Sequence, residues 1–255
     1  MARPHAVGLS DYQTIMDRNK LTVGVFIPCC IDQYSPNTAA RMTQLLARHG
    51  VDCNYPEKLT CCGRLLHECG DTKGARKLGE RMMDAFRHER YVVSCGSGCA
   101  AYVKTRFGQL FADSDRWQEC RQLADKMYDI SDFLCHVVPY MPSDKGYNHT
   151  VAYVDHSPTL RDYKLKEEPR QLLGQVKGLR LVDLGEPALT CGDNELFNNY
   201  FEAIGSELGR QVLASAIGAG ADTITSSDPA CVLHLRACAR KHGLAIKCRH
   251  LVDLL

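Results

Sequence analysis

Two stretches of sequence decide the fold: residues 22–29 read TVGVFIPC, and residues 150–157 read TVAYVDHS. Each is a short apolar run, rich in β-branched residues, that ends in polar or turn-forming residues, which is typical of a buried strand. The two runs begin 128 positions apart. Since a fixed period between similar segments indicates repeated structural units, this offset predicts two copies of one unit.

Other segments repeat at nearly the same spacing. Residues 50–53 (GVDC) align with 178–181 (GLRL) at an offset of 128, residues 60–63 (TCCG) with 189–192 (LTCG) at 129, and residues 92–99 (VVSCGSGC) with 224–231 (ITSSDPAC) at 132. The offset drifts by only four residues across the whole half. Such a narrow drift supports a duplication rather than a chance match.

Segments with helical periodicity lie between the apolar runs. The clearest covers residues 194–217, where apolar residues recur every three or four positions, at Phe197, Phe201, Ile204, Leu208 and Val212. Short buried strands that alternate with helices are typical of βαβ units and a parallel sheet. We therefore expect an α/β protein of two pseudo-symmetric repeats, each a small, mostly parallel sheet flanked by helices.

The repeat boundaries also predict the domain organisation. Residues 1–20 form an N-terminal extension outside the duplication, residues 21–137 the first repeat, and residues 150–255 the second. Between them, residues 138–149 contain two prolines and a glycine, which is typical of a linker.

Composition narrows the class of protein. With 31 basic and 30 acidic residues in 255, the net charge is +1, which argues against nucleic acid as the main partner. The first twenty residues lack the apolar run of a signal peptide, and no stretch is long and apolar enough to predict a membrane span. We expect a cytoplasmic protein, peripheral to a membrane only through partner subunits, whose 14 cysteines are reduced thiols.

The cysteines of the first repeat fall where each strand should end and the next helix begin. Cys29 ends the first apolar run, Cys61 and Cys62 follow the second, and Cys95 and Cys99 bracket the turn after the third. The carboxyl ends of neighbouring parallel strands share one edge of a sheet. The sequence therefore predicts that these thiols converge.

Converging thiolates repel one another unless a cation lies between them, so this group predicts a metal centre. Sulfur ligands suit an iron–sulfur cluster or zinc. Structural zinc favours cysteine pairs spaced by two to four residues. The adjacent pair Cys61-Cys62, with partners about 30 residues away on either side, favours a cluster instead.

At these residues the chain resembles the cysteine-rich CCG domain family of iron–sulfur proteins. The resemblance rests on Cys29, on the Cys61-Cys62-Gly63 triplet and on Cys99, within a repeated unit, and it covers about residues 21–255. The nearest member in size is the iron–sulfur subunit of the L-lactate oxidation complex, and heterodisulfide reductase contains a further relative. The resemblance implies one [4Fe-4S] cluster held by Cys29, Cys61, Cys62 and Cys99.

The second repeat departs from the family pattern. Ser157 stands opposite Cys29 and Thr190 opposite Cys61, which leaves Cys191 and Cys231 as the remnant of a second site. We therefore expect a single cluster, bound by the first repeat. An alternative is that Asp155 and His156 complete a different metal site there. Cys95 is a candidate fifth ligand if the cluster is of the non-cubane kind found in heterodisulfide reductase.

The resemblance implies an electron-transfer subunit of a multi-subunit oxidoreductase that oxidises L-lactate or a related 2-hydroxy acid. Its partners would be a ferredoxin-type iron–sulfur subunit or a flavin protein, and the isolated chain would not turn over substrate. Two alternatives stay open: a subunit that reduces a disulfide at a non-cubane cluster, and a structural subunit in which the metal only stabilises the fold.

The remaining cysteines invite a simpler interpretation. Cys53 lies in an apolar run, and four more lie in helical or strand contexts away from the strand ends: Cys120, Cys135, Cys238 and Cys248. Free cysteine behaves as a small apolar residue, so we expect these five to pack in the core.

Overall fold

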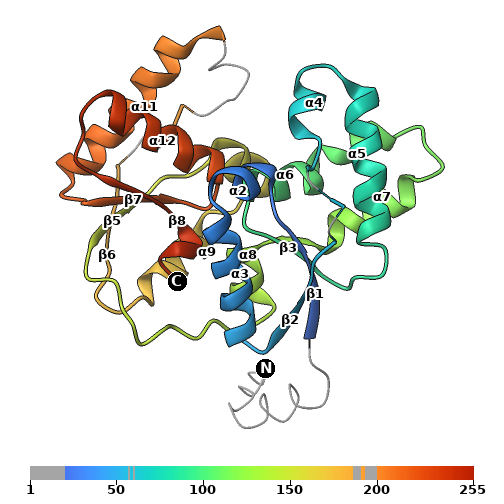
Figure 1. Cartoon of the computed structure of the whole chain (residues 1–255), viewed down its shortest axis with the longest axis horizontal. Helices are drawn as coiled ribbons and strands as arrows, with labels where there is room; N and C mark the ends of the chain where they lie inside the picture. Colours follow the sequence, from blue (N-terminus) through green and yellow to red (C-terminus); the bar gives the residue numbers. More distant parts are fainter. Residues whose placement is uncertain (1–20, 57, 60, 186–190, 193–199) are drawn as a thin grey trace, which may run out of the picture.

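The computed structural model describes residues 21–56, 58–59, 61–185, 191–192 and 200–255. In this part of the chain, two four-stranded sheets form, and every strand is parallel to its neighbours. The predicted α/β class and the two repeats with parallel sheets are confirmed (Figure 1).

The first sheet has the strand order β2-β1-β3-β4. Its strands are β1 (Leu21–Phe26), β2 (Val51–Asn54), β3 (Val92–Ser94) and β4 (Met127–Asp129). The helical segments of this half are α2 (Cys29–Tyr34), α3 (Pro36–Arg48), α4 (Arg64–Glu68), α5 (Thr72–Ala85), α6 (Ser97–Thr105), η1 (Phe107–Phe111), α7 (Trp117–Lys126) and α8 (Ile130–His136).

The second sheet repeats this arrangement in the order β6-β5-β7-β8. Its strands are β5 (Thr150–Tyr153), β6 (Arg180–Val182), β7 (Thr223–Ser226) and β8 (Lys247–His250). The helical segments are η2 (Thr159–Tyr163), α9 (Glu167–Gly174), α11 (Glu202–Gly218), α12 (Pro229–Lys241) and η3 (Leu251–Asp253). In each half the first strand pairs with both the second and the third, so the carboxyl ends of the two central strands lie side by side.

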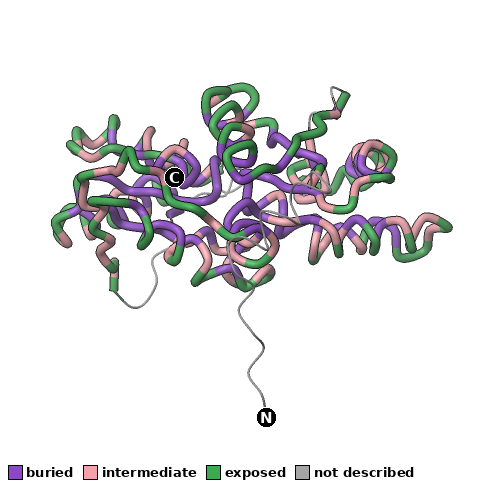
Figure 2. The backbone as a smooth tube through the Cα atoms, turned by 90° about the horizontal axis from the view of Figure 1, so that it is seen from below, coloured by how far each residue is buried: buried purple, intermediate pink, exposed green. Residues whose placement is uncertain are grey.

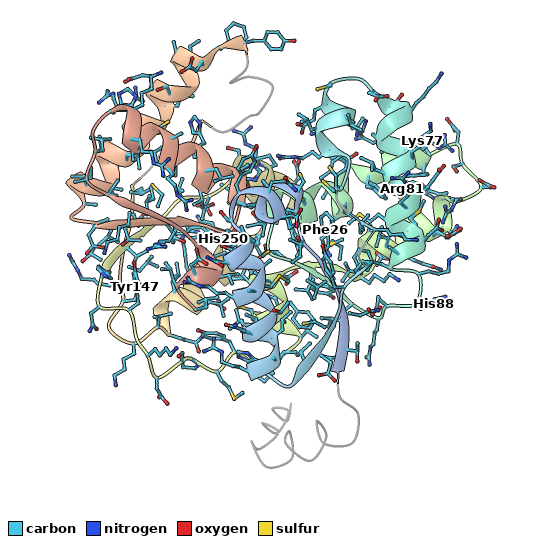
Figure 3. The ribbon with its side chains drawn as sticks, in the orientation of Figure 1. Phe26, Lys77, Arg81, His88, Tyr147 and His250 are labelled. Carbon is cyan, nitrogen blue, oxygen red and sulfur yellow. A yellow bond between two sulfur atoms is a disulfide. The ribbon has the colours of Figure 1, made fainter. Side chains whose placement is uncertain are left out.

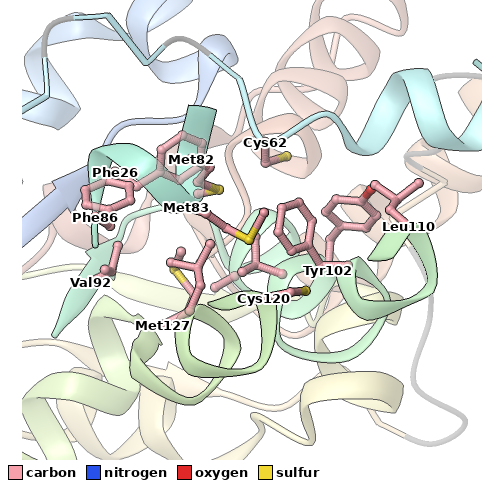
Figure 4. Close-up of a cluster of buried hydrophobic side chains, with 14 of the residues drawn as sticks. Phe26, Cys62, Met82, Met83, Phe86, Val92, Tyr102, Leu110, Cys120 and Met127 are labelled. Carbon is pink, nitrogen blue, oxygen red and sulfur yellow. The ribbon is translucent and has the colours of Figure 1, made fainter. Parts of the chain in front are cut away.

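Successive side chains of β1 point to opposite faces of the first sheet, and helices cover both faces. Val23 and Val25 face a core cluster that includes residues of α3 and α8, whereas Phe26 faces a cluster built from α5, α6 and α7. Figure 4 shows the second of these clusters, with Phe26 beside Phe86 and Met82. Side chains on opposite faces of this sheet therefore belong to different cores.

The two halves pack against each other directly. Leu172 and Val252 of the second half belong to the same core cluster as Val23 and Val25 of the first. Thr38 Oγ1 on α3 also donates to Asp253 Oδ1, at 3.1 Å. Figure 2 accordingly shows buried segments running through the interior of the whole molecule. None of the helices in the described residues is both long and apolar enough to cross a membrane.

A pair of equivalent glycines confirms the alignment of the two halves. Gly63 and Gly192 both have positive φ, +82° and +78°, a conformation that L-residues rarely adopt. Each lies against the backbone of a helix further along the chain, α5 at Gly63 and α11 at Gly192: a Cβ would stand 3.2 Å from Ala75 O at Gly63, and 2.7 Å from Gly205 O at Gly192. Both turns thus need glycine for conformation and for space.

Replacing Gly192 by alanine should lower the free energy of unfolding by more than the conformational cost alone. Forcing a Cβ into left-handed backbone costs about 1–2 kcal/mol, and the contact with Gly205 O adds about 1–3 kcal/mol of overpacking. Gly243→Ala is the matched control, since Gly243 has φ +64° but nothing within 4 Å of a Cβ. Urea denaturation of both variants measures the difference, and equal losses would contradict the packing argument.

Candidate metal centre

Three strand-to-helix connections bring the predicted cysteines together at the carboxyl edge of the first sheet. Cys29 is the first residue of α2, Cys61 and Cys62 precede α4, and Cys99 lies in the first turn of α6. The Sγ atoms of Cys62 and Cys99 stand 3.4 Å apart, although the two residues are 37 positions apart in sequence. The cysteines of neighbouring connections thus meet, as expected from the parallel topology.

The contacts continue along the row of sulfurs. The thiols of Cys29 and Cys62 lie near enough to Cys61 to affect its ionisation, and the Gly63 N–H donates to Cys61 Sγ at 3.4 Å. The four cysteines differ in exposure: Cys62 is buried, Cys61 and Cys99 are partly buried, and Cys29 is exposed. One side of the site therefore lies in the protein and the other faces solvent.

The surroundings of these thiols shift their pKa values in different directions. The interactions with Cys29 and Cys62, followed by the Gly63 N–H and the Arg64 charge, lower the pKa of Cys61 although burial opposes this. The interactions with Cys61 and Cys99, together with burial, raise the pKa of Cys62. Since a thiol must lose its proton to bind a metal, the Gly63 N–H that donates to Cys61 Sγ favours ligation by this residue.

The other two cysteines of this region differ in position. Cys95 is fully buried in the core cluster on the opposite face of the sheet from Cys62 and Cys99, and burial raises its pKa well above the usual range of a thiol. Its placement gives no support to a fifth ligand. Cys30 follows Cys29 in the first turn of α2 and is partly buried.

Four thiols converging from three connections are a donor set whose chemistry fits an iron–sulfur cluster. The side chains are not arranged around the position of a single ion: within the described ranges, no three His, Cys, Asp or Glu side chains are placed to hold one metal. The fit therefore rests on the nature and convergence of the sulfur donors.

In the second half, Cys191 and Cys231 meet at the position equivalent to Cys62 and Cys99, but they form a disulfide, with their Cα atoms 6.1 Å apart. The expectation that all cysteines are reduced thiols is wrong for this pair. Thr190 lies outside the described residues. Asp155 is paired with Arg170 at 2.6 Å, and His156 contacts Thr159 and Asp228, so these two side chains are engaged elsewhere.

Sequence reasoning missed the groups of the second half that reach this site. Asp228 and His156 are both buried and lie against Gly98, next to Cys99, and Arg64 reaches the same point from α4. The Asp228-Pro229 pair does signal a helix start. It could not show that the aspartate also contacts the other repeat.

The predicted core positions of the remaining cysteines hold for three of the five. Cys120, Cys238 and Cys248 are buried, Cys135 is partly buried, and Cys53 is exposed. Cys53 lies on β2, which is an edge strand, and the residues of β2 after Val51 are exposed. An edge position explains why an apolar run failed to indicate burial there.

Two pseudo-symmetric α/β repeats, with thiols gathered at the edge of the first sheet, define a cysteine-rich domain protein. The Cysteine-rich domain family, CCG, matches residues 23–104 and 154–236, one match in each half. The chain belongs to this family, which confirms the resemblance inferred from its motifs.

Several relatives carry one name. Lactate utilization protein A of Halalkalibacterium halodurans is 27% identical over 236 residues, covering 92% of this chain and 96% of the relative. The proteins of the same name from Bacillus subtilis and Geobacillus kaustophilus are 27% and 28% identical, cover 92% of this chain, and are themselves covered to 99% and 98%. The chain is thus similar to these proteins along nearly their whole length.

A solved structure shows a similar fold. The crystal structure of a hypothetical protein from Helicobacter pylori superimposes with a TM-score of 0.59 at 9% sequence identity. The alignment covers 92% of this chain and 49% of that chain, so this chain spans about half the length of that structure. At this identity the similarity shows the fold alone.

Proposed function

We propose that the chain is an iron–sulfur electron-transfer subunit of a multi-subunit oxidoreductase that oxidises L-lactate or a related 2-hydroxy acid. The observation that carries the proposal is the meeting of Cys62 Sγ and Cys99 Sγ at 3.4 Å, with Cys61 and Cys29 in the same row of sulfurs. The substrate class comes from the relatives named Lactate utilization protein A.

In this proposal, Cys29, Cys61, Cys62 and Cys99 hold one [4Fe-4S] cluster, which supplies one-electron transfer when bound. The protein's own groups prepare the site. The Gly63 N–H and the Arg64 guanidinium favour the thiolate of Cys61, and the buried side at Cys62 limits access of water. The exposed side at Cys29 is where a redox partner can approach.

Partner subunits follow from this role, because a single relay needs a donor and an acceptor. A ferredoxin-type iron–sulfur subunit or a flavin protein has the matching one-electron chemistry. Lys77 and Arg81 on α5 lie on the outer side of the first half, away from the second half (Figure 3), and are available for docking.

The alternative of disulfide reduction at a non-cubane cluster has less support. It calls on Cys95 as an extra ligand, but Cys95 lies on the opposite face of the sheet from Cys62 and Cys99. The second half offers only Cys191 and Cys231 of the residues that a second cluster would need, and they are joined to each other.

Reconstitution under anaerobic conditions tests the proposal. Chain treated with ferrous iron and sulfide should take up about four irons per chain with acid-labile sulfide, and dithionite should produce an EPR signal. Iron analysis and EPR on the same sample give the cluster type. Stoichiometric zinc without iron after careful reconstitution, or iron without an EPR-active reduced state, would reject the relay.

A further inference from the structure

The helix that carries Cys99 is not capped by its own half of the chain. The N-cap of α6 is Gly96, which has no side chain to accept hydrogen bonds from the first-turn N–H groups. Two of these N–H groups instead bond to the second half. Ser97 N donates to Ser227 O at 3.2 Å, and Gly98 N donates to Asp228 Oδ2 at 2.8 Å.

The Asp228 side chain accepts hydrogen bonds from the N-termini of two helices. Its Oδ1 accepts from the N–H groups of Ala230 and Cys231, at 3.0 and 3.2 Å, and so caps its own helix α12, while Oδ2 caps α6. The side chain is buried, with 3% exposure. Burial alone would raise the pKa of Asp228, but His156, Arg64 and the N–H groups lower it, so the group is a carboxylate with both oxygens in use.

The close approach of Asp228 to the start of α6 depends on Gly98, which has no side chain. A Cβ on this residue would lie 2.6 Å from Asp228 Oδ2, 2.7 Å from His156 Cε1 and 3.2 Å from Arg64 Nη1. Three charged or polar side chains thus converge on the residue that precedes Cys99. Arg64 is the first residue of α4, directly after the Cys61-Cys62-Gly63 turn. Its side chain therefore brings this turn next to Gly98, where Asp228 also lies.

Arg64 and Asp228 place opposite charges next to the sulfurs. Although burial opposes it, the nearby carboxylate of Asp228 raises the pKa of the partly buried Arg64. The guanidinium and the carboxylate of the second half both stand beside Gly98, the residue before Cys99. Permanent charges at this depth are weakly screened.

We propose that Asp228 of the second repeat is a positioning residue for the cysteine site of the first: it fixes the turn of Cys99, and with Arg64 it sets the charge around the sulfurs. The second repeat would then retain the loop before α12 because that loop completes the first repeat's site. The charge effect rests on the proposed cluster, whereas the capping does not.

Capping is tested on the metal-free chain by amide hydrogen exchange at Gly98. In Asp228→Ala this amide loses its acceptor, and its exchange should accelerate at least tenfold, beyond the change at the amides of β3. Asp71→Ala is the matched control, because Asp71 Oδ1 caps α5 through Gly74 N at 2.9 Å, outside the contact between the repeats. Unchanged exchange at Gly98 in Asp228→Ala would overturn the positioning role. Asp228→Asn, which keeps one acceptor, serves if the alanine variant fails to fold.

The charge effect is tested by the reduction potential of the reconstituted chain. Arg64→Gln removes a positive charge and should shift the one-electron reduction equilibrium about tenfold towards the oxidised state, which is about 59 mV. Asp228→Asn should shift it in the opposite direction, and Arg64→Lys should restore the wild-type potential. A purely structural role predicts lower stability without opposite shifts.

The outcomes separate the two proposals. Wild-type chain that takes up no iron rejects the proposed function, and the exchange experiment still decides the capping. Wild-type chain that takes up iron, with potentials that are unchanged or move in the same direction in both variants, rejects the charge role and leaves the proposed function intact.

Discussion

Replacing Cys62 by serine is expected to remove the iron–sulfur absorbance of the reconstituted chain. Cys62 is the innermost sulfur of the row, 4% exposed, and it contacts both Cys61 and Cys99. Loss of a ligand should cost more than the roughly 10–100-fold in metal affinity that loss of an outer-shell partner costs. Iron and sulfide content after anaerobic reconstitution, with EPR of the reduced sample, measures the effect.

Cys120→Ser is the matched control for this change. Cys120 is 1% exposed and belongs to the same core cluster as Cys62, but it lies on α7, away from the row of sulfurs. The same chemical substitution at equal burial should lower stability and leave the iron content unchanged. Equal iron in the two variants would show that Cys62 is not a ligand.

The same variant separates the electron-transfer role from a purely structural one. If the cluster relays electrons, Cys62→Ser should still assemble with its partner subunits but fail to pass electrons between them. If the metal only stabilises the fold, assembly should fail together with secondary structure, which circular dichroism detects. Co-purification of the variant with its partners measures assembly directly.

The convergence of cysteines could be predicted because it depends only on recognising the strands and on their parallel arrangement. Apolar runs such as residues 22–27 indicate strands, and parallel strands place their carboxyl ends at one edge whatever the details of packing. The duplication made the strand assignments more secure, since each run in the first half had a counterpart in the second. The contact between Cys62 and Cys99 follows from this topology, whereas Cys95, which was expected to join them, lies on the other face of the sheet.

Side-chain environment was harder to predict than topology. The expected helix over residues 194–217 begins, within the described residues, at Glu202, and Phe201 and Ile204 of its apolar stripe are about half exposed. Periodicity indicates which residues share a face of a helix, but it does not show whether another element covers that face. Nearer its end the same helix buries Val212 as expected.

Contacts between the two repeats could not be predicted from the sequence, for a different reason. Gly98 and Asp228 are 130 positions apart, and no periodicity relates a residue of one repeat to its neighbour in the other. The alignment of residues 92–99 with 224–231 places Gly98 and Asp228 at nearby positions of equivalent turns. Only the packing of the two halves shows that these turns face each other.

A second large effect is expected at Asp129, whose contribution to stability should fall as pH rises from about 4 to about 7. The side chain is fully buried at the N-cap of α8. Its Oδ1 accepts from Ser131 N at 2.8 Å and from the Ser131 hydroxyl, while Oδ2 is buried without a hydrogen-bond partner among the described residues. Burial raises the pKa of Asp129 to about 7, although the bonds from Ser131 oppose the shift.

The sign follows from proton linkage. Below about pH 4 the carboxyl is protonated in both states and contributes no pH dependence. Between about pH 4 and 7 the unfolded chain releases the proton of Asp129 while the folded chain keeps it, so the contribution of Asp129 to the free energy of unfolding falls by about 1.4 kcal/mol per pH unit. Over the whole window the loss is about 4 kcal/mol, and above pH 7 it is constant.

Asp129→Asn removes this titration and keeps an oxygen that can accept from Ser131. The variant should therefore gain stability relative to wild type as pH rises, with most of the gain reached by pH 8. Urea denaturation of both proteins at pH 4.5 and pH 8 measures the change, with the exposed Asp113→Asn as a control that should show no such trend. A stability difference that is the same at both pH values would show that Asp129 ionises normally in the folded protein. The oxygen without a partner, Oδ2, would then have to be solvated by water that reaches the start of α8.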